Sequence, residues 1–407
     1  MSNRTGKTDK KEKETLVQYS INKVLDFIGK YVYYDGQDDG EDVALSVLLL
    51  GPPGVGKTEG IRQLAKTLAE KTGRILIDLR KENPDYDEVY KSLDRYFVFI
   101  GFSVTHVEPT DISGVPRASE GKRYVTYLPP EYVYLLSDKR AAGIVFLDEL
   151  TIDNRPDRRS AELKILDEKQ FGFKNLSRNV LVIAAGNTDQ HTSLAEPLPD
   201  PLLRGRVLRF YVKPPTVHEW IEYMTEAFGD RWDKRVAGFL MRYPDSLWVS
   251  YEGDAGYDPR LSPRTWTKLA LLLYRVTTGP HSKEDIEMAV SSLVHGSEYS
   301  LLNTFLETEV PTLDELRLTP EKWKTLALEA KYLITSMLSQ LDVYELCEKY
   351  RELLEAMKGD KEFLELLKIL MSKERRLKYL LFIKRHLPWL FEMYGENVDE
   401  AKDFGLG

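Results

Sequence analysis

The sequence predicts a parallel α/β sheet domain followed by a purely helical region. Short apolar runs alternate with stretches of helical spacing over residues 41–213, which is typical of a parallel sheet covered by helices on both faces. After Pro214 and Pro215 the apolar residues recur only at helical spacing. We therefore predict four parts: an N-terminal tail and helix (1–40), the α/β domain (41–213), a helical domain (214–310) and a C-terminal helical region (311–407).

Composition indicates a globular protein. Of the 407 residues, 42% are hydrophobic and 30% are charged, which excludes an intrinsically disordered chain. The net charge of −8 excludes an overall basic footprint for nucleic acid. The apolar runs are too short for a membrane span, and the N-terminus lacks the apolar core of a secretory signal. A single cysteine, Cys347, excludes an internal disulfide framework, so we expect a cytoplasmic protein.

The order of the elements follows from the apolar spacing. Strands are predicted at 44–50, 74–80, 97–104, 143–147, 179–186 and 207–212. Helices in the first half are predicted at 14–34, 57–71, 81–96, 130–138 and 155–167, with a short hairpin over 115–127. Helices in the second half are predicted at 216–228, 232–243, 263–277, 283–307, 320–339, 341–357, 360–371 and 374–394.

A phosphate-binding loop follows the first of these strands. It comprises Gly51, Pro52, Pro53, Gly54, Val55, Gly56, Lys57 and Thr58, and Glu59 continues into the next helix. The glycines allow backbone N–H groups to turn inward around a phosphate, in conformations that a Cβ would forbid. Lys57 supplies a positive charge for the β- and γ-phosphates, and the Thr58 hydroxyl is a suitable Mg²⁺ ligand. The sequence therefore predicts a site for ATP and Mg²⁺.

Polar side chains end two further predicted strands. Asp148 and Glu149 follow the apolar run 143–147, and Asn187 follows 179–186. In a parallel sheet these strand ends share one edge with the phosphate loop. We assign Asp148 to Mg²⁺, Glu149 to the base that activates water, and Asn187 to orienting that water. The plainer alternatives are a solvated strand end for the two acids and a turn-forming residue for Asn187.

Together these motifs resemble the AAA+ ATPases, most closely the MoxR-like and dynein-related branch. The likeness covers about residues 40–280. The motifs that carry it are Gly51-Pro-Pro-Gly-Val-Gly-Lys-Thr58, Phe146-Leu-Asp-Glu-Leu-Thr151, Ala184-Ala-Gly-Asn187, Glu108-Pro-Thr-Asp-Ile-Ser-Gly-Val-Pro116, Tyr127-Leu-Pro-Pro-Glu131 and Leu261-Ser-Pro-Arg264. The resemblance implies an AAA+ core with a helical lid.

The resemblance also implies roles for residues far from the phosphate loop. Arg206 corresponds to the arginine finger that reaches a neighbouring subunit's nucleotide, with Arg204 as a competing candidate. Arg264 corresponds to the second-sensor arginine of the lid, and it would bind the nucleotide. Each arginine could instead be an ordinary ion-paired surface residue. For the residue that restrains the base, Thr105 and His106 are both candidates.

These features predict Mg²⁺-dependent ATP hydrolysis by a homo-oligomeric ring, expected to be a hexamer. The resemblance implies remodelling of a protein partner, in that family often one with a von Willebrand factor A domain. The alternative is a nucleic-acid-associated motor or a packaging or replication ATPase that uses the basic hairpin carrying Arg117, Lys122 and Arg123. That hairpin could equally be a solvated ribbon. A third hypothesis, a nucleotide switch without turnover, is disfavoured by Glu149.

Overall fold

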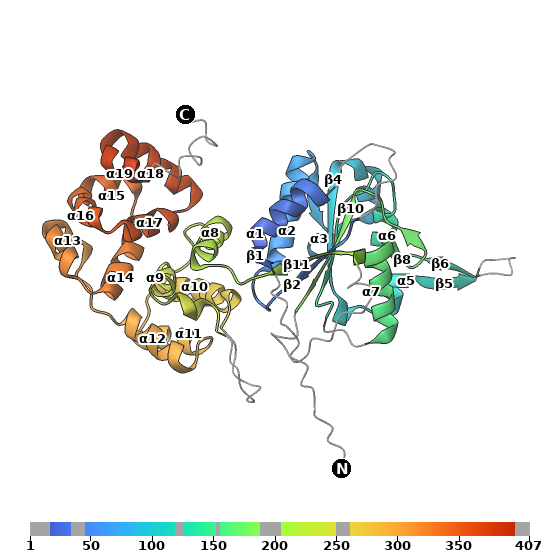
Figure 1. Cartoon of the computed structure of the whole chain (residues 1–407), viewed down its shortest axis with the longest axis horizontal. Coiled ribbons are helices and arrows are strands. Elements are labelled where there is room, and N and C mark those ends of the chain that lie inside the picture. Colours follow the sequence, from blue (N-terminus) through green and yellow to red (C-terminus); the bar gives the residue numbers. More distant parts are fainter. Residues whose placement is uncertain are drawn as a thin grey trace, which may run out of the picture. The chain divides into compact units, whose positions relative to one another are not determined.

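The computed structural model of the chain describes residues 17–33, 45–118, 125–151, 155–187, 205–249 and 261–394. The chain divides into two compact units, residues 1–214 and 215–407. Figure 1 shows that the first unit contains the sheet and that the second is built from helices. The predicted α/β core followed by a helical region is thereby confirmed.

A seven-stranded sheet forms the centre of the first unit. Its spatial order is β1 (Gln18–Tyr19), β11 (Leu208–Val212), β2 (Val47–Leu50), β10 (Val180–Gly186), β7 (Ala142–Asp148), β4 (Tyr96–Ser103) and β3 (Ile75–Asp78). Every neighbouring pair is parallel. The carboxyl ends of β2, β10, β7 and β4 therefore lie at one edge of the sheet, where α/β folds place their ligands.

Helices cover both faces of this sheet (Figure 1). On one face lie α1 (Ile21–Phe27) and α2 (Lys57–Lys71), and on the other lie α6 (Glu131–Leu136) and α7 (Pro156–Glu168). The central strands are apolar along their whole length because both of their faces are buried. Gly60 permits close packing of α2 against α1, since a Cβ there would lie 2.7 Å from a methyl carbon of Leu25.

The segment 74–96 differs from the prediction of a long strand and one helix. The strand ends at Asp78, whose side chain accepts hydrogen bonds from the backbone N–H groups of Arg80 and Lys81 and so begins α3 (Leu79–Glu82). Asn83, with a φ of 44°, ends that helix. Asp85 then caps α4 (Tyr86–Lys91), and a 3-10 helix follows at Leu93–Arg95. The Asp78 cap thus ends the predicted strand early, and Asn83 and the Asp85 cap divide the predicted helix.

The N-terminal helix predicted at 14–34 is also wrong in part. Residues 18–19 form β1 because they pair with β11, and the backbone N–H of Lys213 donates to the carbonyl of Tyr19 at 3.0 Å. The helix that follows ends as a π-helix at Ile28–Val32. The predicted hairpin is present as β5 (Val115–Ala118) and β6 (Val125–Leu128). Further elements of this unit that were not predicted are α5 (Pro109–Ser113), the 3-10 helix Val104–His106, and the small hairpin of β8 (Gln170–Phe171) and β9 (Lys174–Asn175).

Gly143 in β7 lets this strand lie close to its neighbour β4. A Cβ on Gly143 would lie 2.0 Å from the carbonyl oxygen of Val98 on β4. We expect Gly143→Ala to lower the free energy of unfolding by about 3 kcal/mol, measured by urea denaturation, because backbone cannot move away as a side chain can. Gly101→Ala is the matched control on β4, where the nearest atom would lie at an ordinary 3.5 Å. Equal stability of the two variants would contradict this account.

The second unit consists of helices around a single apolar core. They are α8 (Val217–Phe228), α9 (Arg235–Arg242), α10 (Pro263–Thr278), α11 (Lys283–Ser291), α12 (Gly296–Leu306), α13 (Leu313–Leu318), α14 (Leu328–Leu338), α15 (Val343–Lys349), α16 (Arg351–Ala356), α17 (Lys361–Ile369), α18 (Lys373–His386) and α19 (Pro388–Met393), with 3-10 helices at Pro244–Leu247, Pro320–Thr325 and Met357–Gly359.

Four helices predicted here as continuous are broken. The range 283–307 is interrupted before Gly296, which has a φ of 68°. The range 374–394 is interrupted at Pro388, because proline has no N–H to continue α18. In 320–339 the chain is extended at Ala327, and in 341–357 it leaves helical geometry at Tyr350. The two helical parts predicted for residues 214–310 and 311–407 remain a prediction.

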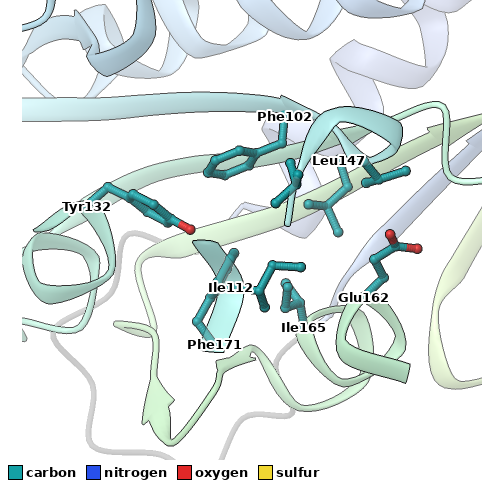
Figure 2. Close-up of a pocket in the computed structure, with 9 residues that line it drawn as sticks. Phe102, Ile112, Tyr132, Leu147, Glu162, Ile165 and Phe171 are labelled. Atoms are coloured by element: carbon teal, nitrogen blue, oxygen red, sulfur yellow. The ribbon is translucent and has the colours of Figure 1, made fainter. Parts of the chain in front are cut away.

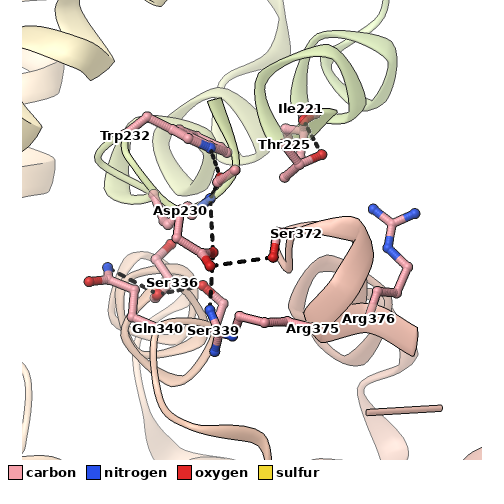
Figure 3. A network of polar contacts seen from close by, with 12 residues as sticks. Ile221, Thr225, Asp230, Trp232, Ser336, Ser339, Gln340, Ser372, Arg375 and Arg376 are labelled. Carbon is pink, nitrogen blue, oxygen red and sulfur yellow. Dashed lines mark hydrogen bonds and ion pairs between the residues drawn. The ribbon is translucent and has the colours of Figure 1, made fainter. Parts of the chain in front are cut away.

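A buried lysine lies between α8 and α9. The side chain of Lys234 is 0% exposed and lies 3.9 Å from the Asp230 carboxylate. Its Nζ donates to the carbonyl of Gly229 at 3.0 Å and lies 3.9 Å from the centroid of the Trp232 ring. Asp230 also pairs with Arg375 of α18 at 3.1 Å (Figure 3). Burial lowers the pKa of Lys234 to about 7, although the Asp230 charge opposes that shift.

This lysine predicts a pH dependence of stability. Because the folded chain holds the proton less tightly than the unfolded chain, stability should rise as the pH increases from about 7 towards 10.5. We expect a gain of about 2 kcal/mol between pH 7 and pH 9, measured by chemical denaturation. Lys234→Met should remove this gain, whereas the exposed control Lys322→Met should retain it. The same pH profile in wild type and Lys234→Met would contradict the assignment.

Candidate active site

The phosphate loop depends on glycines at three positions. Gly54 and Gly56 have φ values of 81° and 90°, which side chains rarely adopt. A Cβ on Gly51 would lie 2.4 Å from the carbonyl oxygen of Val212 on β11. The loop is also joined to β10, since the backbone N–H of Gly51 donates to the carbonyl of Gly186 at 3.3 Å. The loop backbone is thus fixed at the strand ends.

Lys57 is the first residue of α2 and is buried at 7% exposure. Its Nζ donates to the carbonyl oxygens of Gly51 and Pro52 at 2.8 and 2.9 Å, and to Oδ1 of Asn187 at 3.1 Å. The ammonium group therefore lies between the phosphate loop and the end of β10. A lysine surrounded by oxygen acceptors at a helix N-terminus fits the phosphates of a nucleotide.

Thr58 and Asp148 lie together at the next strand end. The Thr58 hydroxyl donates to Oδ2 of Asp148 at 2.7 Å. The other carboxylate oxygen of Asp148 accepts from the backbone N–H of Glu149 at 2.9 Å, which fixes its orientation. A hydroxyl and a carboxylate are oxygen ligands of the kind Mg²⁺ prefers, so this pair fits the ion. When bound, Mg²⁺ would neutralise charge that develops on the phosphates.

Glu149 makes a sharp turn after β7. Its φ of 62° is in the left-handed region, which costs a non-glycine residue about 1 kcal/mol or more. Oε2 of its side chain accepts hydrogen bonds from the hydroxyls of Ser103 at 2.6 Å and Thr105 at 3.2 Å. Thr105 was one of the two candidates for restraining the base. The other, His106, is exposed, and in the described ranges it makes no hydrogen bond to Glu149.

Ser103 was not predicted as a functional residue. It is the last residue of β4 and pairs with Asp148 of β7 in the sheet register. The one feature of the sequence that could have indicated Ser103 is its position at the end of a predicted strand. A serine at a strand end belongs to no distinctive motif, however, and the sequence does not show that β4 lies beside β7.

Apolar side chains anchor the segment that carries Ser103 and Thr105. Val104 and Ile112 are buried and line a small pocket beneath this segment. Figure 2 shows Phe102 and Leu147 of the sheet at this pocket. Glu162 is the one acidic residue among those that line the pocket. The remaining lining residues are Val107, Tyr132, Ile165 and Phe171. The hydroxyls are thus fixed by packing below them.

Asn187 lies immediately after β10. Its side chain accepts a hydrogen bond from Lys57, and its backbone N–H donates to the Thr151 hydroxyl at 2.8 Å. The structure therefore brings together five predicted residues: Lys57, Thr58, Asp148, Glu149 and Asn187.

The predicted arginines and Glu59 lie in different surroundings. Arg206 precedes β11, is 55% exposed and forms an ion pair with Asp167 near the end of α7. Arg264 is an exposed residue in the first turn of α10, in the second unit. Glu59 is exposed in the first turn of α2. Arg204 lies outside the described residues. The catalytic and nucleotide-binding roles of these residues remain predictions.

Residues 47–215 match the family described as "ATPase family associated with various cellular activities (AAA)". They form an AAA+ ATPase domain. The match spans β2 to β11, together with the phosphate loop and the Asp148–Glu149 and Asn187 strand ends. Residues 47–215 thus have the fold of a P-loop ATPase domain, as the sequence predicted. The match does not divide AAA+ domains further, so the MoxR-like assignment remains a prediction.

Two solved structures resemble the chain at low identity. The structure of PCH-2 from C. elegans is 13% identical and aligns over 70% of this chain and 66% of that one, with a TM-score of 0.31. Cdc6p from Pyrobaculum aerophilum is 16% identical over 84% of each chain, with a TM-score of 0.35. The chain thus spans slightly less than two thirds of PCH-2. No curated protein sequence matches it. Within the described residues, no helix has the length and apolar character of a membrane span.

Proposed function

We propose that this AAA+ domain is a Mg²⁺-dependent ATPase that acts in a ring of identical subunits, expected to be hexameric, and uses hydrolysis to remodel a protein partner. The observation that carries the proposal is the arrangement of Lys57, Thr58, Asp148, Glu149 and Asn187 at one edge of the sheet. This edge combines a phosphate cradle, two oxygen ligands for a cation, a carboxylate base and an amide.

Each of these side chains has a distinct task in hydrolysis. Lys57 binds the β- and γ-phosphate oxygens, and Thr58 and Asp148 would hold Mg²⁺. Glu149 accepts a proton from the attacking water as the water oxygen bonds to the γ-phosphorus and the bond to the ADP oxygen breaks. Asn187 orients that water. Ser103 and Thr105 hold the Glu149 carboxylate in place through two hydrogen bonds.

A ring is supported by an exposed arginine, Arg206, that lies just before β11. Phosphoryl transfer is commonly completed by a guanidinium, which can be supplied by a second subunit. Arg206 is the candidate because it is exposed at a surface of the same domain. Arg264 of the lid would contact the same nucleotide from its own chain.

A protein partner is supported by the hairpins. The side chains of Val115, Val125 and Tyr127 on the β5–β6 hairpin are exposed, and so is Phe173 beside them. The Tyr127 and Phe173 rings lie 5.0 Å apart, so the two hairpins share one apolar surface. Exposed apolar surface of this kind fits contact with a polypeptide. A partner with a von Willebrand factor A domain is the version of this proposal that the MoxR-like resemblance implies.

The test is to measure particle mass and partner capture with a variant that binds but does not hydrolyse ATP. Glu149→Gln with ATP and Mg²⁺ should form a ring by light scattering and retain a cross-linked protein partner. Lys57→Ala, which lacks the phosphate-binding charge, is the control and should do neither. A monomeric Glu149→Gln protein would refute the ring. Capture of single-stranded DNA with a steep salt dependence would favour the nucleic-acid motor instead.

A further inference from the structure

We infer that Thr151 is a positioning residue for ATP hydrolysis and that its hydroxyl holds Asn187 at the active site. This inference rests on the proposed roles of Glu149 and Asn187. The Thr151 side chain is buried at 2% exposure, and its Oγ1 accepts the Asn187 backbone N–H at 2.8 Å. Thr151 comes two residues after Glu149, so the same short turn carries the proposed base and the hydroxyl group that binds Asn187.

The hydrogen bond extends the pairing of two strands beyond their regular ends. The β7–β10 ladder ends with Leu147 opposite Ala184. The left-handed turn at Glu149 then redirects the chain across the end of β10, where the Leu150 N–H donates to the carbonyl of Ala185 at 2.9 Å. The Asn187 N–H has a side-chain acceptor, the Thr151 hydroxyl, in place of a strand carbonyl. The conformation of Glu149 and the position of Asn187 are thus set by the same turn.

Gly186 makes room for this contact. A Cβ at position 186 would lie 2.5 Å from Cγ2 of Thr151 and 3.1 Å from Oγ1. Only a glycine therefore allows the threonine methyl to pack against β10 while its hydroxyl reaches the next residue. The methyl and the hydroxyl of Thr151 have separate tasks, packing and hydrogen bonding, and single substitutions can separate them.

The first experiment compares Thr151→Val with Thr151→Ser in the full-length protein. Valine keeps the shape but leaves the Asn187 N–H without its acceptor, so kcat should fall about tenfold to hundredfold. The Kd for a slowly hydrolysed ATP analogue should change less than about twofold, because Lys57 and the phosphate loop are intact. Serine keeps the hydroxyl, and its kcat should stay within about threefold of wild type. Loss of kcat in both variants, or in neither, would overturn the inference.

Two double variants separate positioning from general destabilisation. If Thr151 acts through Asn187, then Thr151→Val should lower kcat no further in an Asn187→Ala background. A loss of kcat in the double variant equal to the product of the two single losses would contradict a shared role. Gly186→Ala should lower kcat by displacing the threonine methyl, and adding Thr151→Ser should restore it. Failure of that rescue would exclude the packing geometry described above. If instead Glu149→Gln hydrolyses ATP normally, the proposed function fails, whatever the Thr151 variants show.

Discussion

Replacing Glu149 by glutamine should reduce kcat for ATP about 100-fold or more while leaving nucleotide affinity almost unchanged. The amide keeps the size of the side chain, and its oxygen can still accept hydrogen bonds from Ser103 and Thr105. It cannot accept a proton from water, and a positioned general base contributes on the order of 10²–10⁴ in rate. Single-turnover hydrolysis and equilibrium binding of ATP measure the two quantities.

The matched control for this variant is Glu70→Gln. Glu70 is exposed near the far end of α2, in the same unit as Glu149. The Glu70→Gln variant should have the same kcat and the same ATP affinity as wild type. If Glu149→Gln retains wild-type kcat, the base is a different group. If it loses ATP affinity as well, the carboxylate contributes to binding rather than to catalysis alone.

Replacing Arg206 by alanine should have a comparable or larger effect, because an arginine finger contributes on the order of 10³ or more to kcat. Asp167 forms an ion pair with this side chain at an exposed position, where such a pair contributes little to stability. The arginine can therefore leave Asp167 for a phosphate at low cost. Steady-state kcat should fall while the protein remains folded. Arg209→Ala, an exposed position on β11, is the control.

Mixing two inactive proteins tests whether this arginine acts between subunits. In a mixed ring, an Arg206→Ala subunit still supplies Glu149, and a Glu149→Gln neighbour still supplies Arg206. Some interfaces are then complete, so the mixture should hydrolyse ATP faster than either protein alone. No gain on mixing would show that Arg206 does not act in trans. Running Arg204→Ala in parallel decides which of the two arginines is the finger.

The sequence predicted those parts of the site that belong to local motifs. The glycines, Lys57 and Thr58 are contiguous, and their backbone requirements can be derived from residue types alone. Asp148 and Asn187 each follow a strongly apolar run, so their shared sheet edge follows from a parallel arrangement. The Ser103 contact to Glu149 was not predictable in this way, because it depends on β4 lying beside β7, and hydroxyl residues are common at strand ends.

The boundaries of the elements were predicted less well than their existence. Apolar spacing continues across Gly296 and Pro388, so the pattern predicted single helices where the backbone is interrupted. The N-terminal strand β1 has two residues, and it pairs with β11. Such pairing is decided by the folded sheet and leaves no periodic signal in a short segment.

The hydrogen bonds of Lys57 bear on how spent nucleotide departs. An ammonium group this deeply covered would be costly to leave without acceptors. Three oxygens of its own chain lie at 2.8–3.1 Å, and they can accept the three protons as phosphate oxygens withdraw. In the proposed function, ADP could therefore leave without exposing an unpaired charge, and one of the three acceptors is the side chain of Asn187, which the same proposal assigns to orienting the attacking water. Hydrolysis and product release would then both depend on this one side chain.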